Sequence, residues 1–116
     1  GEIVIDEVVD RETLMARVGG NLDNLKLLVG IYRGSRDPQL AAIESGLAEG
    51  RPEAVSRGVS TLRGSLATFS AGSVEQCLDR LAEQARAGQL DPTEGERLKQ
   101  ELERLDQALD ALLEGG

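Results

Sequence analysis

The segment Ser60-Thr61-Leu62-Arg63-Gly64-Ser65 combines residue types that could bind an oxyanion. If the segment is helical, Ser60, Arg63 and Gly64 lie on one side, because residues three and four apart are helix neighbours. The planar guanidinium of Arg63 can bond an oxyanion with several donors, and Gly64 leaves the Ser60 hydroxyl unscreened. The expected binding surface comprises Ser56, Ser60, Arg63, Gly64 and Ala67. This flat surface of small side chains would let another protein approach closely.

The rest of the composition restricts the chemistry that this surface could perform. The sequence has no histidine, which removes the commonest general base and the commonest metal ligand. Without a base to take its proton, the Ser60 hydroxyl is a weak nucleophile near neutral pH. Acidic residues are spread along the predicted helices, without the spacing of a calcium loop. We therefore expect no enzyme activity, metal or cofactor.

Length and charge set further limits on the protein class. The chain has 116 residues, which favours one domain over residues 1–116. It carries 21 acidic and 13 basic side chains, for a net charge of -8, so nucleic acid is not an expected partner. No apolar run reaches the roughly 18 residues of a membrane span. We expect a cytoplasmic monomer, in which the apolar residues Ile3, Val4 and Ile5 could pack on the remaining domain.

Hydrophobic spacing and capping residues predict five helices. These are Arg11 to Val18 after an Asp10 cap, a long helix from the Asn21 cap to Gly50, Pro52 to Phe69, a helix opened by Ser73 and ending before Gly88, and a last helix that starts at Asp91-Pro92-Thr93-Glu94 and runs past Leu112. Pro38 lies inside the long helix and predicts either a kink near Gly34 to Asp37 or two abutting helices. In the last helix, Glu94 is expected to return a hydrogen bond to the cap.

Four amphipathic helices with short connections predict an all-α fold, an antiparallel up-down four-helix bundle with a short N-terminal lead helix. The last helix has a two-heptad leucine pattern, which we interpret as core, with a dimer seam as the alternative. Cys77, the one cysteine, lies within the apolar stripe of the fourth helix. We expect it to be a buried structural thiol.

The run Ser60-Thr61-Leu62-Arg63-Gly64-Ser65 resembles the His-Thr-Leu-Lys-Gly-Ser signature of histidine phosphotransfer (Hpt) domains of bacterial phosphorelays. The resemblance extends over nearly the whole chain: a short lead helix ending in Gly19-Gly20, a long helix with an internal proline, the signature helix and two leucine-rich helices. Ser60 takes the position of the phosphoaccepting histidine. By position, Arg63 matches the lysine that helps to neutralise the phosphoryl group, and Gly64 the glycine that gives a receiver domain access.

The resemblance implies a cytoplasmic Hpt-like domain that docks the receiver domain of a response regulator or hybrid kinase but lacks the phosphoaccepting histidine. Some large chemotaxis-type kinases contain similar modules with Ser or Thr at that position, so one alternative is that Ser60 itself accepts phosphate. Another is a helical adaptor that self-associates through the last helix and has no link to signalling. A further alternative is an ordinary Hpt domain whose histidine was deliberately changed to serine, in which case the fold and the partner would be the same.

Overall fold

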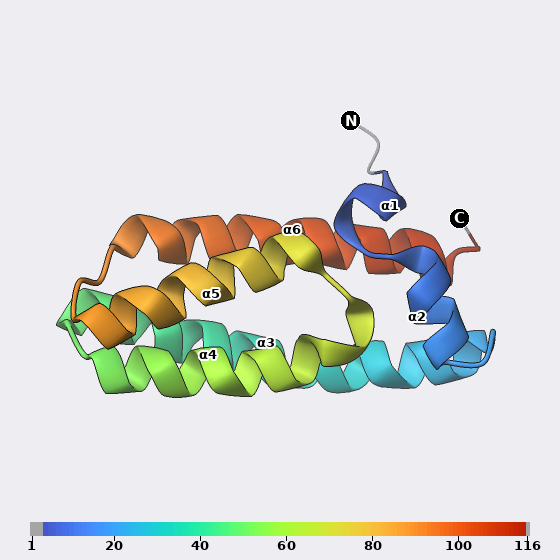
Figure 1. Ribbon diagram of the computed structural model, residues 1–116. Coiled ribbons are helices and arrows are strands. Elements are labelled where there is room, and N and C mark those ends of the chain that lie inside the picture. Colours follow the sequence, from blue (N-terminus) through green and yellow to red (C-terminus); the bar gives the residue numbers. More distant parts are fainter. Residues whose placement is uncertain (1–3, 116) are drawn as a thin grey trace.

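Every regular element of the computed structural model, which describes residues 4–115, is helical. The elements are α1 (Ile5–Val8), α2 (Arg11–Arg17), α3 (Leu22–Glu49), α4 (Pro52–Leu66), the 3-10 turn η1 (Ala67–Phe69), α5 (Gly72–Ala87) and α6 (Pro92–Leu113). The four long helices lie along a common direction (Figure 1). Helix α3 packs against α4 and α6, and α5 packs against the same two helices. The predicted all-helical bundle is confirmed.

The N-terminal part contains one more helix than the sequence predicted. The single turn α1 buries Ile5 and Val8 and packs on α6. Val4 does not share this burial, because 54% of it is exposed, and Ile3 lies outside the described residues. Such a short turn has too few spaced apolar residues to show a helical period, which explains why the sequence pattern missed it.

The predicted caps of α2 and α3 are confirmed. The N–H of Thr13 donates to Asp10 Oδ1 at 3.1 Å, and the N–H of Asp23 donates to Asn21 Oδ1 at 2.8 Å. At the other end of α3, Gly50 has a φ of 64°, a left-handed conformation that glycine adopts without a Cβ clash. Capping residues therefore determine where these helices begin and end.

Pro38 does not divide α3, which is one uninterrupted helix from Leu22 to Glu49. The alternative of two abutting helices is therefore wrong. Proline cannot donate to the carbonyl one turn earlier, but the helix is kept by its packing against α4 and α6 along its length.

The start of α5 differs from the prediction by one residue. Helix α5 begins at Gly72, so Ser73 lies inside the first turn, and the N-cap residue is Ala71, which makes no side-chain capping bond. Ala71 is completely buried. The start of α5 is therefore fixed by the burial of Ala71 and not by a hydrogen bond from a capping hydroxyl.

The predicted Asp91 cap of α6 is confirmed, but the return bond from Glu94 is not. Asp91 Oδ1 accepts from the N–H of Thr93 at 2.9 Å. The Glu94 carboxylate instead accepts from Nε of Arg80 on α5, at 3.2 Å to each oxygen. The N–H of Asp91 is satisfied by Gln84 Oε1 at 3.0 Å. Both groups of the expected return bond therefore have partners on α5: the Glu94 carboxylate bonds Arg80, and the Asp91 N–H bonds Gln84.

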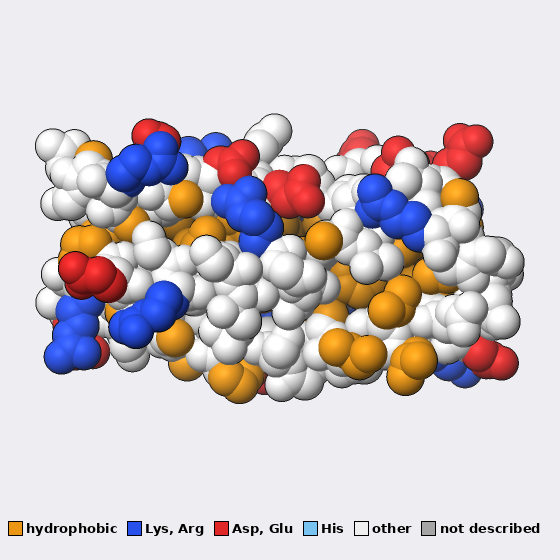
Figure 2. Space-filling view, turned by 60° about the horizontal axis from the view of Figure 1, so that its bottom comes forward, with side chains coloured by type: hydrophobic (Ala, Val, Ile, Leu, Met, Phe, Trp, Pro, Cys, Tyr) orange, Lys and Arg blue, Asp and Glu red, His pale blue; other side chains and the backbone are white. Residues whose placement is uncertain are grey.

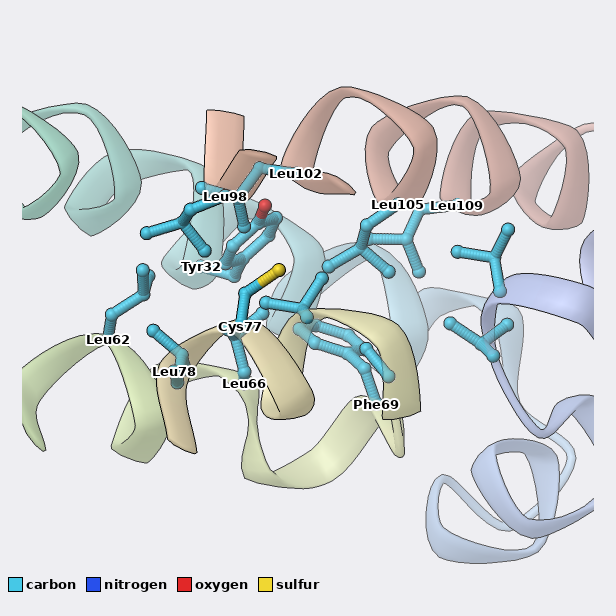
Figure 3. Close-up of a cluster of buried hydrophobic side chains, with 14 of the residues drawn as sticks. Tyr32, Leu62, Leu66, Phe69, Cys77, Leu78, Leu98, Leu102, Leu105 and Leu109 are labelled. Carbon is cyan, nitrogen blue, oxygen red and sulfur yellow. The ribbon is translucent and has the colours of Figure 1, made fainter. Parts of the chain in front are cut away.

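The core lies between the four long helices. Figure 3 shows Tyr32 and Phe69 among leucines of α4, α5 and α6, and the two rings meet edge to face with centroids 5.5 Å apart. The leucine stripe of α6 is buried: Leu98, Leu102, Leu105, Leu109 and Leu112. The core interpretation of this stripe is confirmed, and a dimer seam formed by these leucines is wrong because they already pack within one chain.

Cys77 is buried in the same core, as predicted. Burial raises the pKa of its thiol, because a thiolate loses its hydration there, although the positive charge of Arg80 acts in the opposite direction. Nη2 of Arg80 donates to the Cys77 sulfur at 3.4 Å. Burial outweighs the effect of Arg80, which favours a structural thiol.

One side chain of α2 fastens the lead helix to the end of α4. Nη1 of Arg17 donates to the carbonyls of Ala67 and Thr68 at 2.9 and 3.0 Å and to the Ser70 hydroxyl at 3.0 Å. We call these contacts the Arg17 clamp. The clamp satisfies carbonyl groups that a helix end leaves without intrahelical partners.

None of the helices in residues 4–115 combines the length and the apolar character needed to cross a membrane.

Candidate functional site on α4

Helix α4 displays the signature segment because its opposite side is buried. Arg51 and Pro52 start the helix, with proline at a first-turn position where its missing N–H costs nothing. The buried stripe consists of Val55, Val59, Leu62 and Leu66, and Phe69 of η1 extends it. The α-helix ends at Leu66, and the last predicted turn is 3-10 helix. The residues between these apolar positions must therefore face solvent or the neighbouring helices.

The predicted site residues lie on this outer part of α4. Ser56, Ser60, Gly64 and Ala67 are exposed, and Arg63 is partly exposed. Their spacing of three and four residues brings them together on one side of the helix. We call these five residues the α4 face. Within residues 4–115, no group hydrogen-bonds the Ser60 hydroxyl, so it is available to a partner.

The two glycines inside α4 have different surroundings. A Cβ built on Gly58 would lie 2.6 Å from Cγ1 of Ile43, so glycine is needed there for the close approach of α3 and α4. A Cβ built on Gly64 would meet nothing within 4 Å. Each glycine costs about 1 kcal/mol of helix stability relative to alanine. The close packing of α3 and α4 explains why glycine is present at position 58. No contact within the chain explains why glycine is present at position 64.

Arg63 has a partner that the sequence did not indicate. Its Nη1 donates to Asp79 Oδ1 on α5 at 2.8 Å. The two residues are sixteen positions apart, and their meeting depends on how α4 and α5 are rotated about their axes. No local spacing rule gives that rotation, so sequence reasoning could not find Asp79.

The α4 face offers groups suited to recognition. Ser60 has no histidine to activate it, since the chain contains none. Within the described residues no group of three or more acidic or cysteine side chains is placed to hold a metal ion. The α4 face can therefore present a hydroxyl, a guanidinium and bare backbone to a partner.

The surrounding surface also distinguishes this side of the molecule. In Figure 2 the lower middle of the view consists mainly of other side chains and backbone, charged side chains lie above it, and hydrophobic ones gather toward the end that carries α2. On α3, Leu27 and Ile31 are 65% and 60% exposed. Exposed apolar side chains grouped on one helix are typical of a protein-binding region.

Comparison with protein families gives one result that agrees with this geometry. The family model of the Hpt domain matches residues 27–108, which include α4, α5 and most of α3 and α6. The chain belongs to the Hpt domain family. The predicted membership of the Hpt family is thereby confirmed. Searches among curated proteins and among solved structures found no match.

Family membership indicates the general class of signalling to which the domain belongs. Hpt domains are phosphotransfer carriers of two-component signalling and interact with receiver domains of response regulators. In this Hpt domain, α4 is the helix that carries the signature-like segment, of which Ser60 and Gly64 are exposed and Leu62 is buried.

Proposed function

We propose that this Hpt domain docks a receiver domain through the α4 face and does not accept a phosphoryl group. In this proposal the antiparallel four-helix bundle is a scaffold that presents α4, with Ser60 at the position of the family's histidine. The observation that carries the proposal is the exposed Ser60 beside Gly64, whose Cβ position is open to solvent.

The chemistry of the acceptor supports docking without transfer. A phosphohistidine is a phosphoramidate, which is labile enough to pass its phosphoryl group to a receiver aspartate. A serine phosphate is an ordinary ester with a far lower transfer potential. The chain has no histidine at any position, so it cannot form the labile species. Ser60 also lacks a base that would make its hydroxyl a good nucleophile.

Charge and shape support a receiver domain as the partner. The segment 51–72 contains three arginines and one glutamate, which makes it locally basic on an acidic chain. Receiver domains of this family's partners present an acidic pocket, and complementary charge sets orientation and association rate. The exposed side chains of Leu27 and Ile31 on α3 would add apolar contact area to the same interface.

The test is phosphoryl transfer from phosphorylated receiver and kinase domains to the chain, read by intact mass, with a Ser60→His variant alongside. We expect label on Ser60→His only, which would show a working Hpt scaffold without its acceptor. Ser56→His is the matched control, because it places a histidine one turn away on the same exposed surface. It should remain unlabelled.

Two outcomes would contradict the proposal. Acid-stable label on the unaltered chain, mapped to Ser60, would make this serine a phosphoacceptor. Absence of receiver binding, together with a dimeric mass in solution, would favour a self-associating adaptor instead.

A further inference from the structure

The cations near Ser60 differ in whether they are already bonded within the chain. Arg63 makes an ion pair with Asp79, 2.8 Å between Nη1 and Oδ1, and both side chains remain partly in solvent. A receiver carboxylate that approaches Arg63 must compete with this internal carboxylate. Asp79 also places a negative charge at the edge of the α4 face, so the pair contributes little net positive charge there.

Arg57 is in the opposite situation. It is exposed, and its side chain forms no ion pair or hydrogen bond with any residue between positions 4 and 115. It precedes Ser60 by three residues, so the two side chains are neighbours on the outer side of α4. A guanidinium here can bond a partner's carboxylate without first giving up another bond.

The surface around Arg57 also has a suitable shape. Arg57 lines an open hollow of about 390 Å³ between the start of α4 and the end of α5, together with Glu53, Ser56 and Ala85. Glu53 is the one acidic residue lining this hollow, and it makes no ion pair with Arg57. The hollow adjoins the α4 face through Ser56, so a side chain docked there would belong to the same interface.

We propose that Arg57 is the main cation that binds acidic side chains of the receiver domain, and that Asp79 withholds Arg63 from this role. The inference rests on the proposed docking function and names the residues that determine its charge complementarity. The signature segment would predict that Arg63 contributes more to receiver binding than Arg57, and this inference predicts the opposite.

The experiment measures the affinity of a purified receiver domain, chosen because it binds the unaltered chain, for Arg57→Gln, Arg63→Gln and Asp79→Asn. We expect Arg57→Gln to weaken binding about tenfold at low salt and less at high salt, as for a charge at an interface. Arg63→Gln should weaken it about twofold or less. In the Asp79→Asn background, Arg63→Gln should have a larger effect, because Arg63 is then free to bind the partner.

Arg97→Gln is the control for the loss of one positive charge, since Arg97 is exposed on α6, away from the α4 face, and pairs there with Glu94 at 4.0 Å. It should leave the affinity unchanged. Equal losses in Arg57→Gln and Arg97→Gln would overturn the inference, and so would a larger loss in Arg63→Gln than in Arg57→Gln. If no receiver domain binds the unaltered chain, the docking function itself fails, which is a different result.

Discussion

The inner and outer sides of α4 both contain a glycine, but for different physical reasons. On the inner side, Gly58 lets α3 approach so closely that an added Cβ would meet Ile43 at 2.6 Å. On the outer side, Gly64 faces open space. The first glycine removes a side chain so that this chain can pack, and the second leaves a surface on which a partner can pack. In the same helix, glycine at position 58 is required for packing, whereas alanine at position 64 would make the helix more stable.

The largest change in stability is expected for Leu62→Ala, which removes a buried side chain on the inner side of α4. Leu62 is completely buried, and its truncation should lower the free energy of unfolding by about 2–5 kcal/mol. Ser60→Ala is the matched control, because it lies two residues away on the outer side and should change stability by about 0.5 kcal/mol or less. Urea unfolding followed by circular dichroism measures both. Similar losses in the two variants would show that the sides are not energetically distinct.

The next effect compares the two glycines directly through Gly58→Ala and Gly64→Ala. Both substitutions gain helix propensity, so Gly64→Ala should stabilise the domain by about 0.5–1 kcal/mol. Gly58→Ala adds the overpacking against Ile43, so its free energy of unfolding should be about 1–3 kcal/mol lower than that of Gly64→Ala. Because the intrinsic helix term is similar in both variants, their difference in the same urea experiment isolates the packing term. Gly64→Ala should also weaken receiver binding while it stabilises the fold, and gains in both quantities would contradict a role for the bare surface.

The smallest effect is expected at Asp10, which is exposed like Ser60 but has its polar atoms bonded within the chain. Hydrogen bonds from the side chain and backbone of Thr13 lower the pKa of Asp10 below its ordinary value of 3.8. The carboxylate therefore stabilises the fold above that pH, and this contribution is lost as the pH falls through the lowered pKa.

Asp10→Asn retains an acceptor for the Thr13 N–H but does not titrate. The unaltered chain should be slightly more stable than Asp10→Asn at pH 6, and this difference should disappear in acid. Urea unfolding at a series of pH values measures it. A difference that does not change with pH would show that the charge of Asp10 plays no part.

The parts of the fold that depend on neighbouring residues in sequence could be predicted. The caps at Asp10, Asn21 and Asp91 and the buried leucine stripe of α6 follow from local spacing, and the structure confirms them. Local rules failed where another helix supplies the partner. Glu94 would complete a cap in an isolated helix, but Arg80 from α5 binds its carboxylate instead.

The same distinction applies to the candidate site. The exposure of Ser60 and Gly64 could be predicted, because the apolar stripe of one helix determines which side faces solvent. The pairing of Arg63 with Asp79, and hence the difference between Arg63 and Arg57, depends on how two helices are rotated against each other. The sequence alone therefore indicated which surface to consider but not which cation on it is available.

The Arg17 clamp has a consequence for the order in which the domain folds. Helix α2 has seven residues, which is too short to be stable in isolation. In the folded domain it is held by the burial of Leu14 and by the bonds from Arg17 to the carbonyls of Ala67 and Thr68, which lie fifty or more residues further along the chain. Hydrogen exchange at the α2 amides should therefore report on the integrity of η1, so that the protection of the lead helix reflects the state of the C-terminal end of α4.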